Sequence, residues 1–217
     1  MKHLFKNSLS IYEYFVDYLL RKYLRKTTEV FDCGCGNGDH TSIAKRYSNK
    51  VTGGDFVNFL NPKYDIEFRK ISEGYYGNKN EFDVVISFDV IEHVKDPHLY
   101  LKMLADIVKS GGVIIIGTPN RLRLSNKIIE LIHGKITFPR NLGYHLESGG
   151  EIIHIQEFTM PELIDLGKGV PGLKVVEKLS GFLGLYTPLG ALGIKSTGQH
   201  SLIKFAQHLF IVYNVTK

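Results

Sequence analysis

The sequence predicts an α/β fold built on a doubly wound, mostly parallel sheet. Three observations support this. Short apolar segments alternate with helical ones from residue 29 onward, a glycine-rich turn follows the first apolar segment, and the alternation ends near Pro119. Such alternation is typical of a parallel sheet with helices on both faces. All 217 residues are expected to form one domain.

Hydrophobic spacing and the positions of glycine and proline define the individual elements. The alternating part contains an N-terminal helix over 8–26, a strand over 29–33, a helix over 39–46, strands over 50–55, 66–70 and 82–88, a helix over 97–109 and a strand over 113–117. Later expected elements are a loop-rich insert over 120–150 with a helix over 125–133, a short helix over 161–167, and strands over 174–179 and 209–215.

Composition excludes several classes of protein. The chain has a net charge of +5 and 43% hydrophobic residues, and it has no apolar run long enough for a transmembrane helix. Its first residues lack the apolar core and cleavage site of a signal peptide. The only cysteines, Cys33 and Cys35, are too close in sequence for an easy disulfide. A reducing, cytoplasmic location is therefore expected.

The glycine-rich turn has the pattern Gly34-x-Gly36-x-Gly38 between a strand and a helix. Glycines allow a tight turn and a close backbone approach to a ligand, and a helix N-terminus favours an anionic group. The dinucleotide fingerprint requires a third glycine one residue later, where this chain has Asp39. This difference argues against NAD or FAD.

Two further segments extend this ligand site. Asp55 ends the next strand, and its carboxylate could accept hydrogen bonds from a ribose diol or could simply complete the turn after two glycines. The third segment, residues 82–104, reads FDVVISFDVIEHVKDPHLYLKML. Together these segments resemble class I S-adenosylmethionine (SAM) dependent methyltransferases. The similarity is greatest to the group with ubiquinone-pathway and polysaccharide-modifying O-methyltransferases, and it continues into residues 154–159, HIQEFT.

The resemblance implies a Rossmann-like sheet of seven strands with an antiparallel last strand. It also implies SAM as cofactor and S-adenosylhomocysteine as product. The methionine half of SAM would lie along the glycine turn, formed by Asp32, Gly34, Cys35, Gly36 and Gly38. The ribose and adenine would contact Asp55 and Phe56, and the methionine tail and methyl group would border Ser87, Phe88 and Asp89.

The adenine amino group is the one contact for which this sequence departs from its relatives. Many relatives have an aspartate after the third strand, whereas residues 70–74 here read KISEG. The resemblance therefore leaves three options for this contact, which are Ser72, Glu73 or a backbone group.

Two histidines are candidates for catalysis, because a hydroxyl acceptor must lose its proton during methyl transfer. His93 follows the fourth strand, and His154 begins the HIQEFT segment. Either histidine could instead have a structural role in packing or capping. The spacing of histidines and carboxylates in the sequence does not indicate a metal site.

The expected acceptor is a small molecule, a lipid-linked compound or a glycan, methylated at oxygen. Basic residues of the insert could recognise an anionic group or could form a solvated face; they are Arg121, Arg123, Lys127, Lys135 and Arg140. The uncharged residues 179–194 could line a pocket, touch a membrane surface, close a lid or form a dimer contact. Two alternative functions are methylation of RNA or tRNA, which is less favoured, and a non-catalytic SAM-binding role. The sequence leaves the oligomeric state open.

Overall fold

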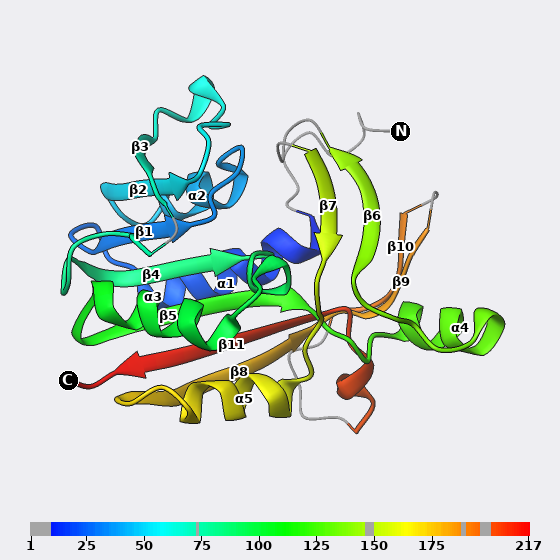
Figure 1. Ribbon diagram of the computed structural model, residues 1–217. Helices are drawn as coiled ribbons and strands as arrows, with labels where there is room; N and C mark the ends of the chain where they lie inside the picture. Colours follow the sequence, from blue (N-terminus) through cyan, green and yellow to red (C-terminus); the bar gives the residue numbers. More distant parts are fainter. Residues whose placement is uncertain (1–9, 73, 146–149, 188–189, 196–200) are drawn as a thin grey trace.

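The computed structural model describes residues 10–72, 74–145, 150–187, 190–195 and 201–217. At its centre is a seven-stranded sheet with the order β3-β2-β1-β4-β5-β11-β8 (Figure 1). The strands of this sheet are β1 (Glu29–Cys33), β2 (Lys50–Asp55), β3 (Glu67–Lys70), β4 (Phe82–Phe88), β5 (Val108–Pro119), β8 (Leu173–Gly181) and β11 (His208–Val215).

The first five strands of the sheet run parallel, and β11 inserts antiparallel between β5 and β8. This arrangement confirms the predicted doubly wound sheet with an antiparallel last strand. Because β1 to β5 are parallel, their carboxyl ends meet at one edge of the sheet, where open α/β folds bind their ligands.

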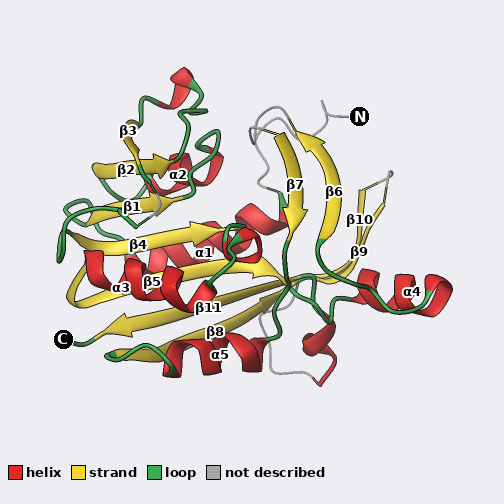
Figure 2. Ribbon diagram, in the orientation of Figure 1, coloured by secondary structure: helices red, strands yellow, loops and turns green. Residues whose placement is uncertain are grey.

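Helices cover both faces of the sheet (Figure 2). Those of the central layers are α1 (Ile11–Tyr23), α2 (Asp39–Ala44), α3 (Pro97–Ile107) and α5 (Met160–Lys168). Phe15 of α1 is fully buried in a cluster with Phe210 of β11. Leu104 of α3 and Leu163 of α5 are buried in a second cluster with Ile211. Because neighbouring residues of a strand point to opposite faces, Phe210 and Ile211 anchor the two layers of helices.

The remaining elements lie beyond the carboxyl ends of β4 and β5 (Figure 1). They are α4 (Leu124–His133), the antiparallel pair β6 (Arg140–His145) and β7 (Gly150–His154), the antiparallel pair β9 (Leu183–Thr187) and β10 (Gly190–Ile194), and the short 3-10 turns η2 (Ile91–His93) and η4 (Ser201–Phe205). A further 3-10 turn, η1 (Pro62–Tyr64), lies in the connection between β2 and β3. The uncharged 179–194 stretch thus contributes the end of β8 and the β9–β10 hairpin. Among the described helices, none has the length and apolar character needed to cross a membrane.

Candidate active site

A cleft of about 1310 Å³ opens at the carboxyl ends of β1 to β5. Gly36 of the glycine turn and Asp55 of β2 line one part of it. Glu92, His93 and His154 line another part of the same cleft. The predicted cofactor turn and the predicted catalytic histidines therefore share one continuous space, although up to 120 residues of sequence separate them.

The glycine turn forms an open cradle in this cleft. Backbone N–H groups of Gly34 and Cys35 donate to the carbonyl of Gly54 at 2.8 and 3.1 Å, which fixes the turn against β2. Gly34 has a φ of +84°, and a Cβ there would lie 2.4 Å from Cγ2 of Val90. Gly36 has a φ of +50°, and a Cβ there would meet no atom within 4 Å. Gly36 itself lines the cleft, and a side chain at this position would project into free space.

Asp55 is held at the end of β2 by two backbone donors. Its Oδ2 accepts from the N–H of Gly36 at 2.9 Å, and its Oδ1 accepts from the N–H of Phe56 at 2.7 Å. A carboxylate has about four lone-pair sites, so two remain for a ligand. The side chain of Phe56 also lines the cleft and is 53% exposed, which leaves its ring available for stacking.

Several predicted cofactor residues lie behind the cleft wall instead of on it. The Asp32 carboxylate is buried and accepts a hydrogen bond from the Thr41 hydroxyl at 2.6 Å. Burial raises the pKa of Asp32 to about 7, although the Thr41 hydrogen bond opposes this shift. The buried Ser87 hydroxyl shares a hydrogen bond of 2.7 Å with the Tyr100 hydroxyl. The two further predicted residues behind the wall are Gly38 and Phe88.

The other residues predicted to contact the cofactor differ in whether they line the cleft. Asp89, with a φ of +54°, lines both the main cleft and an adjoining hollow of about 410 Å³, where Cys35 also lies. Ser72 is exposed, pairs through its backbone with Tyr75, and does not line the cleft. Glu73 lies outside the described residues.

His208 is a cleft residue that sequence reasoning missed. It begins β11, lines both hollows, and its Nε2 lies 3.0 Å from the Tyr186 hydroxyl. Burial lowers the pKa of His208 to about 3. A single histidine at the start of an apolar strand gives no local signal of a site, because only the sheet order brings it beside the glycine turn.

The catalytic candidates His93 and His154 meet beside Glu92. Their ring centroids are 5.0 Å apart, and Nε2 of His154 lies 4.0 Å from Oε1 of Glu92. Glu92 is fully buried, and its Oε2 accepts from the Thr118 hydroxyl at 2.9 Å. Nδ1 of His93 contacts the carbonyl of Ile153 at 2.8 Å. The sequence reasoning missed Glu92, whose only signal was its place next to His93.

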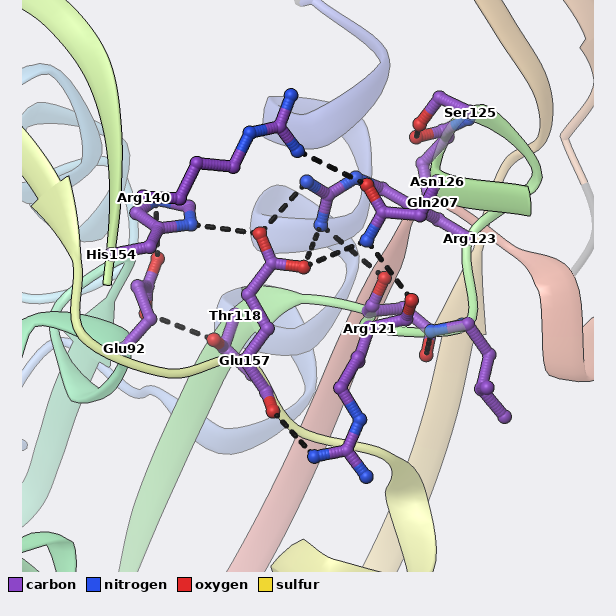
Figure 3. Close-up of polar contacts among 12 residues, drawn as sticks. Glu92, Thr118, Arg121, Arg123, Ser125, Asn126, Arg140, His154, Glu157 and Gln207 are labelled. Carbon is purple, nitrogen blue, oxygen red and sulfur yellow. Dashed lines mark hydrogen bonds and ion pairs between the residues drawn. The ribbon is translucent and has the colours of Figure 1, made fainter. Parts of the chain in front are cut away.

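Glu157 holds His154 in position (Figure 3). Its Oε1 lies 2.8 Å from Nδ1 of His154, while Arg123 binds both carboxylate oxygens at 2.6 and 2.8 Å. Asn126 donates to Oε2 at 3.0 Å. Burial alone would raise the pKa of Glu157, but the hydrogen bonds from His154 and Arg123 lower it to about 2.

The basic residues of the insert are largely engaged within the protein. Arg123 pairs with Glu157, Arg121 pairs with Glu162 at 2.5 Å, and Lys127 pairs with Glu130 at 2.6 Å. The insert therefore uses much of its positive charge to bind carboxylates of the chain itself.

Residues 9–170 match the model of a family described as a methyltransferase domain. The chain belongs to this methyltransferase family. The methyltransferase is 30% identical over 106 residues to the ubiquinone biosynthesis O-methyltransferase of Dinoroseobacter shibae, covering 44% of this chain and 43% of that protein. It is 29% identical over 163 residues to the corresponding protein of Brucella anthropi, covering 69% of this chain and 61% of that one.

A solved structure supports the same fold for the methyltransferase. The 1,6-didemethyltoxoflavin-N1-methyltransferase of Burkholderia thailandensis, with bound 1,6-didemethyltoxoflavin and S-adenosylhomocysteine, aligns with a TM-score of 0.61 at 16% identity. The alignment covers 100% of this chain and 82% of that one. The chain thus belongs to a methyltransferase family and shares its fold with a methyltransferase that binds S-adenosylhomocysteine.

Proposed function

We propose that this methyltransferase transfers a methyl group from SAM to a hydroxyl oxygen of a small amphiphilic acceptor. The observation that carries the proposal is the single cleft that joins the glycine turn and Asp55 to Glu92, His93 and His154. When bound, SAM supplies an electrophilic methyl group, and transfer to a hydroxyl yields the methyl ether, S-adenosylhomocysteine and one proton.

The cradle beside β2 provides the proposed cofactor site. Gly36 leaves room along the turn for the methionine portion, and Gly34 allows the turn to pack closely against Val90. Asp55 offers its two remaining lone-pair sites to the ribose hydroxyls. The exposed ring of Phe56 stacks on the adenine. Asp89 lies where the cleft and the adjoining hollow meet, and borders the methionine tail.

The acceptor occupies the opposite part of the cleft in this proposal. Apolar side chains of the β6–β7 pair line the cleft beside His154 and suit an acceptor with an apolar body; they are Leu142 and Ile153. Arg123 is the basic residue of the insert that lines the cleft, and its pair with the buried Glu157 leaves it poorly suited to bind an anionic acceptor. The names of the related O-methyltransferases also favour oxygen as the acceptor atom.

We place the acceptor hydroxyl against Glu92, His93 and His154. These side chains bring a carboxylate and two imidazoles to the cleft, which are the groups that can promote loss of a hydroxyl proton. The pairing of His154 with Glu157 fixes the orientation of the imidazole, so that its Nε2 points towards Glu92.

A methyl-transfer assay with labelled SAM tests this proposal, using a catechol with an alkyl chain as the acceptor probe. His154→Ala is expected to lower turnover by about 100-fold or more, the usual scale for loss of assisted proton transfer, with unchanged SAM affinity by calorimetry. His133→Ala, on the exposed face of α4, is the matched control and should retain wild-type turnover. Undiminished turnover by His154→Ala would contradict the proposal.

A further inference from the structure

We propose that the β9–β10 hairpin and α4 form a surface through which two copies of this chain associate. β10 pairs with β9 on one side, and no described residue pairs with its other edge. All five residues of β10 are exposed. An edge strand presents unpaired N–H and C=O groups, and another peptide strand can pair with both kinds of group. The hairpin therefore offers a place for strand addition.

The β10 edge lacks the charges found at the edges of the central sheet. Both outer strands of that sheet, β3 and β8, contain charged side chains; they are Glu67, Arg69 and Lys70 on β3 and Lys174, Glu177 and Lys178 on β8. In contrast, residues 179–194 contain no charged side chain. Charges on an edge strand normally hinder its pairing with another chain. The β10 edge is not protected in this way.

The two faces of the hairpin have different surroundings. Tyr186 lies on the inner face, where it lines the cleft and its ring centroid is 5.0 Å from that of Phe182. On the same face, a Cβ at Gly193 would lie 2.9 Å from the Phe182 ring. Side chains alternate between the faces of a strand, and cross-strand partners share a face. The outer face therefore consists of two apolar pairs, which are Leu183 with Ile194 and Leu185 with Leu192.

α4 extends this apolar surface. The helix contacts β9 and lies next to the hairpin (Figure 1). Leu131 of α4 is 87% exposed and Leu192 of β10 is 73% exposed, and Ile132 and Ile194 are exposed as well. Soluble monomers seldom expose a large continuous apolar area, and such areas usually mark interaction sites. We therefore expect this surface to be covered in solution.

A second copy of the chain suits this surface better than an anionic membrane or RNA. In a two-fold dimer a surface meets its own copy, so a surplus of one charge would cause repulsion. Residues 179–194 carry no charge, and Lys127 of α4 pairs with Glu130 at 2.6 Å. Lys195, which follows β10, lies over the Tyr14 ring of α1. A membrane or RNA would instead favour a cluster of unpaired cations.

Antiparallel pairing of β10 with its own copy satisfies the symmetry of such a dimer. A two-fold axis relates two identical antiparallel strands, so no second kind of edge is needed. The pairing joins two hairpins into one four-stranded sheet. A two-stranded hairpin is marginally stable, whereas three or more strands with an apolar face are more stable. Because Tyr186 lines the cleft from the inner face, dimer formation would also stabilise one wall of the cleft.

Sedimentation velocity of the full-length protein over a range of concentrations tests the dimer. The wild type should reach twice the chain mass of 24.6 kDa. Leu192→Glu should raise the dissociation constant of the dimer by about 100-fold or more, because it brings like charges together across the axis. Its exposed position should leave the fold of the chain intact. Val176→Glu, at an exposed position of the β8 edge strand, is the matched control and should dimerise like wild type.

Hydrogen exchange distinguishes strand pairing from other contacts, because the β10 amides should exchange more slowly in the wild-type dimer than in Leu192→Glu. A wild type that stays monomeric at every concentration would overturn the proposal. A dimer that Leu192→Glu leaves intact, or whose β10 amides are unprotected, would overturn it too. Binding of a monomeric wild type to phosphatidylglycerol vesicles would assign the surface to a membrane instead. These readouts do not involve methyl transfer, so they test the dimer independently of the proposed function.

Discussion

His154 Nδ1 lies 2.8 Å from Glu157 Oε1, three residues further along the chain. Both residues belong to the HIQEFT segment, which begins at the last residue of β7. Arg123, which begins α4 as its N-cap, binds the same carboxylate through two contacts. Arg123 of the insert therefore fixes the side chain of Glu157, which in turn orients His154 in the cleft.

The pairing of Arg123 with Glu157 should be important for stability. Their side chains are 12% and 0% exposed, so Arg123→Ala would leave a buried carboxylate without its charge partner. The free energy of unfolding should fall by about 3–5 kcal/mol in urea titrations. The matched control is Arg121→Ala, whose pair with Glu162 is 43% exposed on both sides and should cost about 0–1 kcal/mol. Equal losses for the two variants would contradict this account.

Asp55→Ala should weaken SAM binding. The carboxylate has two lone-pair sites left for the ribose hydroxyls, and hydrogen bonds to a charged group contribute about 1.5–3 kcal/mol. Calorimetry should show a loss of affinity of that size. Asp165→Ala, at an exposed position of α5, should bind SAM like wild type. An unchanged affinity of Asp55→Ala would show that Asp55 does not hold the ribose.

Gly36→Ala should combine backbone strain with obstruction of the cleft. Its φ of +50° is unfavourable for alanine by about 1–2 kcal/mol, and the new methyl group would enter the proposed cofactor cradle. Gly134→Ala introduces at least as much backbone strain, because its φ of +83° and ψ of −163° lie in a region that glycine alone commonly adopts. Open space surrounds this position, which lies away from the cleft. Thermal unfolding should detect both substitutions, whereas SAM affinity should fall only for Gly36→Ala. Loss of affinity in both variants would argue against a specific role of the cradle.

Asp32 should make the stability of the cofactor-free protein decrease with rising pH. Burial raises its pKa from 3.8 to about 7. The folded state therefore keeps a proton that the unfolded chain loses above about pH 4, and stability from this site is lost as the pH rises towards 7. Asp32→Asn should flatten this slope in urea titrations between pH 4.5 and 7. Parallel slopes for the variant and wild type would contradict the prediction.

The parts of the protein that depend on local sequence could be predicted, and those that depend on distant contacts could not. The strand, turn and helix around Gly36 follow from neighbouring residues, and so does the position of Asp55 at a strand end. The pairing of Arg123 with Glu157 joins residues 34 positions apart, so the sequence showed only a cluster of positive charge. The role of Glu92 likewise depends on its burial and on its position beside His154 of β7. Neither feature is visible in its own segment of the sequence.

The most direct test of the account is the chemical identity of the methylated atom. The full-length protein should be incubated with SAM carrying a ¹³C-labelled methyl group and with the alkyl catechol, and the product should be examined by NMR. The account predicts a labelled methyl ether, greatly reduced in His154→Ala and undiminished in His133→Ala. Label on nitrogen or carbon, or no transfer by a protein that binds SAM, would contradict it.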